Sequence, residues 1–158
     1  MNRRWYWTFF TLVFLLSGCG GGKSLPSGGG VSAPQSQEKR VVAKAKSLLG
    51  VPYKYGGTTP AGFDCSGFVG YVFKKSAGVD LPRVSNKMYG VGKRISRTKL
   101  RPADLVYFKI EKQKSLHVGI YLGGGRFIHA PSSGKKVNIQ DMNFTYWTKR
   151  YLGARRIL

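Results

Sequence analysis

Three side chains in this sequence could together cleave an amide bond: Cys65, His117 and His129. A thiolate attacks a carbonyl carbon, and an imidazole can take the thiol proton and later pass it to the leaving amine. A further polar group that orients the imidazole completes such a set. The chain has only two histidines, so one of them can serve as the base while the other orients it.

Cys65 stands in the string Asp64-Cys65-Ser66-Gly67, where a loop is expected to become a helix. Asp64 can cap that helix, which places the cysteine in the first turn. The backbone potential there, and a nearby imidazolium, are expected to lower the pKa of the thiol. The residues alone leave a second interpretation open, because the cysteine aligns with apolar residues of the same helix and could be a small core residue.

The two histidines flank an expected β-hairpin, in which HVGIYL is followed by three glycines and RFIHA. A three-residue loop sets Leu122 opposite Arg126 and Gly119 opposite His129. His117 is then a diagonal neighbour of His129 on one face, within reach of an aromatic side chain, and Gly119 is expected to leave open space between them. Two core histidines or a stray metal site remain alternatives, although their spacing from the cysteine matches no common structural zinc pattern.

The elements expected to hold these residues are helices first and strands second. Apolar residues at helical spacing predict a helix over residues 36–49, with Ser36 as a possible cap and Gly50 as its stop. A second helix is predicted over residues 65–77 and a shorter one over 85–91. The order predicts an α+β fold with a mostly antiparallel sheet. The predicted strands cover residues 105–108, 117–122, 126–130, 136–139 and 154–158.

The N-terminus has the features of an export signal. Arg3 and Arg4 precede an apolar run over residues 5–16, which is too short to span a bilayer, since a transmembrane helix needs about 20 residues. The string LSGC that ends at Cys19 resembles the lipobox of bacterial lipoproteins. The resemblance implies a signal peptide over residues 1–18 and a lipid on Cys19; an incidental cysteine behind an ordinary secretory leader is the alternative.

Residues 19–35 are rich in glycine, serine and proline and are predicted to form a flexible tether between the lipid and a domain over residues 36–158. An aspartate directly after the lipidated cysteine resembles an inner-membrane retention signal, and this chain carries Gly20 at that position instead. The expected location is therefore the cell envelope, at the outer membrane facing the periplasm if the organism has two membranes. With Cys19 lipidated, Cys65 has no intramolecular partner, so no disulfide is expected.

The chain is strongly basic, with 27 lysines and arginines against 6 acidic residues and a formal charge of +21. Such a surface attracts polyanions. No helix-turn-helix, zinc-finger or aromatic RNA-binding signature supports nucleic acid as the partner, so anionic envelope polymers suit an exported chain better. The basicity could also be only a solubility trait. No metal or organic cofactor is implied, and a monomer is expected.

The strings PYKYGG, FDCSGFV, HVGIY and RFIHA, in this order, resemble the NlpC family of cell-wall cysteine endopeptidases, a bacterial branch of the papain-like fold. The resemblance covers about residues 38–158 and implies N-terminal helices packed on the sheet. It also implies that Cys65 is the nucleophile, His117 the general base and His129 the residue that orients it. Tyr53 matches a family tyrosine near the oxyanion site, although it could be a core aromatic beside a turn.

The stretch LPRVS resembles the family segment that contributes substrate contacts. By that resemblance Arg83 and Ser85, with Asp64 and Ser66, are expected to hold the charges of the stem peptide. Arg83 could equally be one of many surface cations.

The sequence departs from the family pattern at three positions. Val84 and Met88 stand where relatives often carry a hydroxyl residue and glutamine, and Ala103 replaces a frequent glycine. None of these departures touches the catalytic trio.

The resemblance implies a peptidoglycan hydrolase that cleaves stem or crosslink peptides, at the bond between γ-linked D-glutamate and a diamino acid. Two other classes stay open: a catalytically idle basic lipoprotein that binds the envelope, and a papain-like acyltransferase that acts on lipid. The PYKYGG and LPR stretches favour the peptidase.

Overall fold

The computed structural model describes residues 34–111 and 115–158. The expected signal peptide, Cys19 and nearly all of the expected tether lie outside these residues, so those expectations stay predictions. Within the described ranges, no helix is long and apolar enough to cross a membrane.

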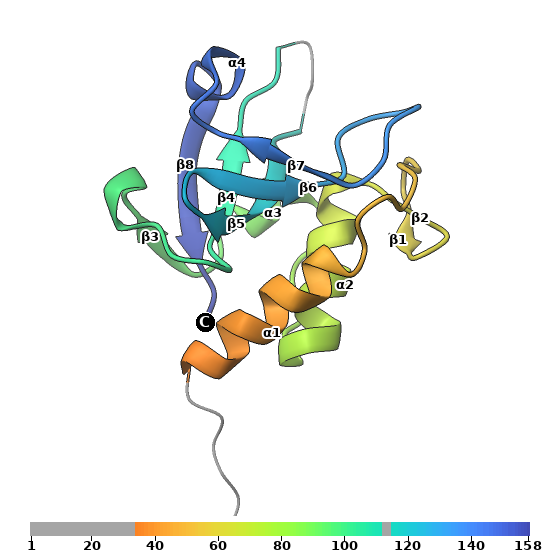
Figure 1. The fold of residues 1–158 in the computed structure, drawn as a ribbon, viewed down its shortest axis with the longest axis horizontal. Coiled ribbons are helices and arrows are strands. Elements are labelled where there is room, and N and C mark those ends of the chain that lie inside the picture. The colour runs from red at the N-terminus through yellow and green to blue at the C-terminus, as the bar shows by residue number, and fades with distance from the viewer. Residues whose placement is uncertain (1–33, 112–114) are drawn as a thin grey trace, which may run out of the picture. The chain divides into compact units, whose positions relative to one another are not determined.

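Two helices, α1 (Pro34–Lys46) and α2 (Cys65–Ala77), lie side by side along one face of a sheet (Figure 1). The prediction of α2 is confirmed at both ends: Asp64 caps it, and Gly78 ends it in the left-handed conformation at φ 70°.

The predicted bounds of α1 were wrong at both ends. The helix begins at Pro34, so Ser36 lies inside the first turn and is not its cap. Proline suits the first turn because the N–H that it lacks has no partner there. The helix ends at Lys46. In the turn that follows, Gly50 N–H donates a hydrogen bond of 2.9 Å to the carbonyl of Val137, the residue before Asn138.

The main sheet has six strands in the order β3-β8-β4-β5-β6-β7, and every neighbouring pair is antiparallel. The α+β class with an antiparallel sheet is therefore confirmed. Three predicted strands match closely, whereas the last two were misplaced by two or three residues. The strands are β3 (Lys93–Ile95), β4 (Leu105–Phe108), β5 (His117–Gly123), β6 (Arg126–His129), β7 (Asn138–Asp141) and β8 (Tyr151–Arg156).

Several short elements connect these parts, and all but one were missed because they are too short to show a periodicity. The helix α3 was predicted after Ser85 but stops at Met88. The short elements are β1 (Thr58–Thr59), β2 (Gly62–Phe63), α3 (Ser85–Met88), the 3-10 helix η1 (Arg97–Lys99) and α4 (Thr145–Thr148).

Apolar side chains pack on both faces of the sheet. Alternation along β4 sends Tyr107 toward the two long helices and Phe108 to the opposite face. The first face builds the larger core with residues such as Phe68 of α2, and the second packs against Trp147 of α4. The sheet is thus buried between α1 and α2 on one side and α4 with its flanking loops on the other.

The β5–β6 hairpin has the predicted register in its body, with Ile120 opposite Ile128. The predicted pair Leu122–Arg126 was wrong, because a bulge pairs Gly123 with Arg126 instead. The turn is therefore Gly124–Gly125, with φ values of 59° and 74°, as two-residue hairpin turns require.

Gly119 does not leave open space. A Cβ atom on it would lie 2.7 Å from Phe127 Cδ2 and 3.3 Å from His129 Cβ. The glycine instead allows the side chains of β6 to lie tightly over β5.

Candidate active site

Cys65 is the first residue of α2, and its neighbours hold it there through directional contacts. The Oδ1 atom of Asp64 accepts a hydrogen bond from Gly67 N–H at 2.7 Å, which fixes the first helical turn. The turn also packs directly on the loop of the PYKYGG string, since a Cβ on Gly67 would lie 2.0 Å from the Gly57 carbonyl oxygen. Only glycine at this position lets the loop approach the nucleophile.

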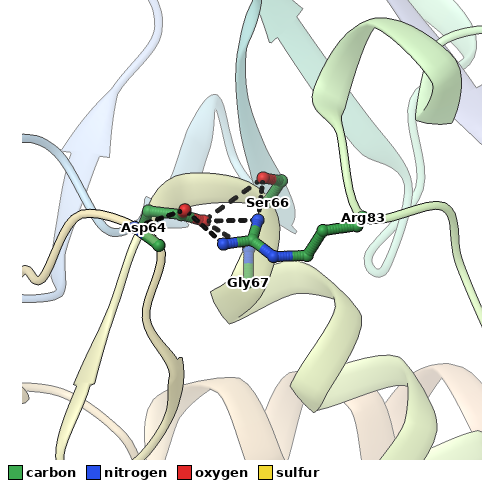
Figure 2. A network of polar contacts seen from close by, with 5 residues as sticks. Asp64, Ser66, Gly67 and Arg83 are labelled. Carbon is green, nitrogen blue, oxygen red and sulfur yellow. Dashed lines mark hydrogen bonds and ion pairs between the residues drawn. The ribbon is translucent and has the colours of Figure 1, made fainter.

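Arg83 forms an ion pair with Asp64 beside the nucleophile. Figure 2 shows its guanidinium aimed at the start of α2, where Nη2 donates to Asp64 Oδ2 at 2.6 Å and Nη1 donates to Asp64 Oδ1 at 3.1 Å. The same Nη1 donates to Ser66 Oγ at 2.8 Å. Burial acts to raise the pKa of Asp64, but the bonds from Arg83 and Gly67 outweigh it and lower the pKa below its usual value. Asp64 is therefore a fixed anion.

Cys65 is a free, partly buried thiol. The helix α2 that it begins packs on β5, the strand that carries His117, and the backbone N–H of Val118 on that strand acts to lower the pKa of the thiol. Burial raises the pKa of this thiol and the charge of Asp64 adds to the rise, although the N–H groups of Val118 and the helix terminus oppose it. The predicted lowering of the Cys65 pKa was wrong, because desolvation outweighs the helix N-terminus.

The imidazoles of His117 and His129 meet directly. His117 Nε2 lies 2.6 Å from His129 Nδ1, with the rings at 84° to one another. His117 is 4% exposed and His129 1% exposed. Trp147 stacks on His117 with ring centroids 5.8 Å apart and meets His129 edge-on at 5.2 Å. The two imidazoles are therefore held by packing as well as by their mutual hydrogen bond.

Asn138 determines which nitrogen of each imidazole carries the proton. Its Nδ2 donates to the Lys136 carbonyl at 3.0 Å, so its Oδ1 faces His129 Nε2, 3.2 Å away. An oxygen acceptor there requires a proton on His129 Nε2, which leaves His129 Nδ1 as an acceptor from His117 Nε2. The lone pair of His117 is consequently on Nδ1, the nitrogen that the pair leaves available as a base.

Both histidines are neutral at pH 7. Burial lowers the pKa of His117 to about 4. Burial also lowers the pKa of His129 well below its usual value, and the neighbouring His117 and Lys135 act in the same direction. At neutral pH the site therefore holds a protonated thiol at Cys65 and uncharged imidazoles at His117 and His129.

Tyr53 and Cys65 pack against the same core cluster, and a negative charge on Cys65 would raise the pKa of the Tyr53 phenol. Burial raises the pKa of its phenol, and the negative charges of Cys65 and Asp64 raise it further. The phenol therefore keeps its proton and can act as a hydrogen-bond donor. Its backbone N–H donates to the Lys135 carbonyl at 2.8 Å, which joins the loop before α2 to the loop before β7.

The structure thus brings Cys65, Tyr53, Asp64, Ser66 and Arg83 together at the start of α2. Ser85 begins α3 and is buried like Ser66, with 2% of its surface exposed. The substrate contacts that the sequence predicts are not tested and stay predictions; they are those of Asp64, Ser66, Arg83 and Ser85.

Sequence reasoning missed two members of the histidine side, Asn138 and Trp147. Asn138 carried a usable signal, because it is an amide within a predicted strand and pairs directly opposite His129 across β6 and β7. No sequence pattern indicated Trp147, since it lies in a helix of only four residues.

Comparison with known proteins agrees with this geometry. Residues 50–156 match the model of the NlpC/P60 family. The chain belongs to the NlpC/P60 family. Its fold is accordingly papain-like, as expected. A crystal structure of an NlpC/P60 family protein from Bacillus cereus ATCC 10987 superimposes with a TM-score of 0.71 at 35% identity, over 77% of this chain and 40% of that one.

Two curated relatives are similar over the same region. The gamma-DL-glutamyl hydrolase of Bacillus subtilis (strain 168) is 42% identical over 125 residues, which cover 78% of this chain and 30% of the relative. The murein DD-endopeptidase MepS/murein LD-carboxypeptidase of Escherichia coli (strain K12) is 43% identical over 121 residues, covering 77% of this chain and 63% of the relative. The chain therefore spans less than two thirds of these relatives.

Proposed function

We propose that this NlpC/P60 protein is a cysteine endopeptidase that hydrolyses peptides of peptidoglycan. The observation that carries the proposal is the placement of Cys65 at the start of α2 beside β5, together with the one-directional chain of hydrogen bonds that leaves His117 Nδ1 unprotonated. A nucleophile, a base and an orienting group in this arrangement are what amide cleavage through an acyl-enzyme requires.

In the first half of the reaction, the Cys65 thiol passes its proton to His117 Nδ1 as the sulfur forms a bond to the carbonyl carbon. We propose that the backbone N–H of Cys65 and the Tyr53 phenol stabilise the oxyanion. The bond from carbon to nitrogen then breaks, and His117 gives the proton to the leaving amine. Since His117 must become a cation in this step, His129 stabilises it through the bond to Nε2.

In the second half, water replaces the sulfur. His117 takes a proton from the water as its oxygen attacks the thioester carbon. When the bond from carbon to sulfur breaks, the proton returns to the sulfur, and the acid is released. Burial lowers the pKa of His117 to about 4, so its Nδ1 is unprotonated at neutral pH and can accept the proton.

The bond that we propose is the one between γ-linked D-glutamate and a diamino acid. The similarity to a gamma-DL-glutamyl hydrolase supports it. A crosslink peptide is the alternative target, since another relative is a murein DD-endopeptidase.

Mass spectrometry of purified muropeptides incubated with the full chain tests the activity. We expect new fragments whose masses identify the cleaved bond, and we expect Cys65→Ala to produce none while keeping its circular dichroism spectrum. Cys19→Ser is the matched control, because it changes the other cysteine and should leave cleavage unaltered. Retained cleavage by Cys65→Ala would refute the mechanism.

The alternative classes give different results in the same assay. Tight binding to the wall with no cleavage by the wild-type chain would favour an idle envelope binder. Hydrolysis or transfer of acyl esters, without any action on peptides, would favour an acyltransferase.

We further propose that the protein is anchored in the envelope through a lipid on Cys19 and that its surface binds anionic envelope polymers. The charge supports the second point: Asp64, Asp80, Asp104 and Glu111 each pair with a basic side chain, so most of the six acidic residues are already engaged. Metabolic labelling with a fatty acid that Cys19→Ser abolishes, and membrane fractionation of the same variant, test the anchor.

A further inference from the structure

Positive charges gather at one edge of the main sheet, on and after β3. This strand is the first in the order of the sheet, and within the described ranges no strand pairs with its outer side. Lys93 and Arg94 are exposed on the strand, and Lys99 and Arg101 are exposed on the segment that leads to β4. No acidic residue lies between residues 92 and 101. The charges along this edge are therefore all positive.

The pairing of β3 with β8 places like charges directly opposite one another. Lys93 is opposite Arg156, and Arg94 is opposite Arg155. Like charges in such positions destabilise a sheet. Of these four side chains, only Arg156 has a carboxylate partner within the described ranges, because its Nε and Nη2 donate to Asp104 at 2.8 Å and 2.7 Å. A bound anion would relieve the repulsion that remains.

The segment after β3 belongs to the same group of charges. Arg156 Nη2 donates to the Lys99 carbonyl at 3.1 Å, and Arg101 N–H donates to Asp104 Oδ2 at 2.8 Å. These bonds hold the backbone of this segment beside the end of β8. The four exposed cations of this surface are named the basic edge: Lys93, Arg94, Lys99 and Arg101. None of the ion pairs in the described ranges uses these four side chains, so their charges can meet an anionic partner.

The start of α1 lies near the basic edge. The bond from Asp104 raises the pKa of Arg156, and the charge of Glu38 in α1 adds to the rise. Figure 1 shows the start of α1 and the C-terminus, which follows β8, at the same end of the domain. The sequence from Cys19 to Pro34 is about 15 residues long, and a flexible tether of that length spans about 20 Å. A lipid on Cys19 would therefore keep the basic edge close to the membrane.

We propose that the basic edge binds the phosphate groups of an anionic lipid surface and so orients the domain on the membrane. The choice of a lipid surface rests on the proposed anchor at Cys19. A lipid chain and a basic surface are complementary signals, because each lysine or arginine close to anionic headgroups strengthens the binding. The complementary charge and the nearby start of α1 together favour headgroup phosphates as the partner.

This orientation leaves the active site accessible. The two histidines lie on β5 and β6, which are three and four strands away from β3 in the sheet. Neighbouring strands are about 4.8 Å apart, so the histidines lie roughly 15 to 20 Å from the basic edge. Binding of the edge to a membrane should therefore leave the cleavage of peptides unchanged.

Vesicle binding by the Cys19→Ser full chain tests the proposal, because this parent chain lacks the residue that would carry the lipid. Sedimentation with vesicles of equal parts phosphatidylglycerol and phosphatidylcholine is compared with sedimentation with phosphatidylcholine alone. The apolar run over residues 5–16 is common to all variants and acts on both kinds of vesicle. We expect Lys93→Gln with Arg94→Gln to weaken binding to the anionic vesicles roughly fivefold per charge, about 25-fold in all.

Two further double variants complete the design. Lys99→Gln with Arg101→Gln changes the part of the basic edge outside the strand, and we expect a similar loss of binding. Lys136→Gln with Lys149→Gln is the matched control, because it removes two exposed lysines outside the basic edge and should change binding less than about twofold. Urea unfolding should show that the variant in β3 is at least as stable as its parent, because it removes two pairs of like charges.

Charges on an edge strand can also serve only to prevent pairing with another chain. Undiminished vesicle binding by both variants of the basic edge, with or without self-association, would overturn the proposal in favour of that role. Binding to soluble polyphosphate but not to vesicles would overturn it as well, since the partner would then be a free polymer. Charge-dependent vesicle binding in a chain that takes up no lipid at Cys19, or that cleaves no muropeptide, would refute the anchor or the peptidase and support the basic edge.

Discussion

The two sides of the active site are built on opposite physical principles. On the nucleophile side, Asp64 is a fixed anion bonded to Arg83, Ser66 and backbone N–H groups, and the side chain of Arg83 remains 45% exposed. On the histidine side, His117 and His129 are uncharged and almost completely buried. Directional charged bonds fix the first side, whereas packing and a chain of neutral hydrogen bonds fix the second.

The two sides are therefore sensitive to different conditions. A charged network with exposed members loses strength to salt and to removal of one partner. A neutral buried pair is insensitive to salt, but protonating it costs free energy because burial penalises the cation. Changes of pH should therefore act first on the histidine side, and changes of charge on the nucleophile side.

The largest expected effect is a loss of stability between pH 7 and pH 4. The folded pKa of His117, about 4, lies below its unfolded value of about 6.5, so its neutral form stabilises the fold fully above pH 6.5 and that stability is lost as the pH falls toward 4. We expect the free energy of unfolding in urea to fall by about 3 kcal/mol over this range.

The titration of Asp64 on the nucleophile side does not contribute to the loss of stability between pH 7 and pH 4. The pKa of Asp64 is lowered below its ordinary value of 3.8, so its contribution to stability is lost only at more acidic pH. His117→Gln is the control and should show a shallower dependence. A stability that stays constant from pH 7 to 4.5 would show that the histidines are not held neutral by burial.

A smaller effect is expected from Asp64→Ala on the other side. The substitution removes the helix cap and leaves Arg83 unpaired, which together should cost about 2 kcal/mol after allowance for solvent screening of the exposed guanidinium. Urea unfolding at low and high salt measures this cost, and the difference from the wild type should shrink in high salt. Asp80→Ala removes the exposed pair with Lys74 and should change stability very little.

A third effect tests the relay through Asn138. Asn138→Ala removes the acceptor that keeps the proton on His129 Nε2, so both imidazoles can adopt the wrong tautomer. We expect kcat to fall about tenfold with KM unchanged. Nitrogen-15 spectra of the imidazoles should show mixed tautomers in this variant. Asn138→Asp retains an oxygen acceptor and should keep more activity; equal activity in all three proteins would exclude a positioning role.

The nucleophile side could be predicted from the sequence because its parts are local. The cap, the nucleophile and the end of α2 lie within residues 64–78, and the helix was predicted with correct bounds. The direct contact of the histidines could also be predicted, since a short hairpin sets its own register. Within the hairpin, the predicted pairing of Leu122 with Arg126 and the predicted open space around Gly119 were wrong, because both depend on how the side chains of β6 pack.

The rest of the histidine side depends on long-range packing. Trp147 reaches the imidazoles from a short helix beyond β7, which no local pattern indicates. The raised pKa of Cys65 was missed for the same reason: the helix N-terminus is visible in the sequence, whereas the burial that outweighs it depends on the packing of the folded chain. Local motifs therefore predicted which residues could do chemistry, but they predicted the wrong direction for the shift in the pKa of Cys65.

The smallest effect is expected at Ala103, away from both sides of the site. Ala103 has a φ of 74°, in the left-handed region that costs a residue with a Cβ about 1–2 kcal/mol. Ala103→Gly removes that strain but also removes a buried methyl worth about 0.8 kcal/mol. The net gain in stability should be roughly 0.5 kcal/mol, measurable by urea unfolding, with kcat/KM unchanged. A loss of stability would mean that methyl packing outweighs the strain, and a change in activity would mean that the start of β4 acts on the active site.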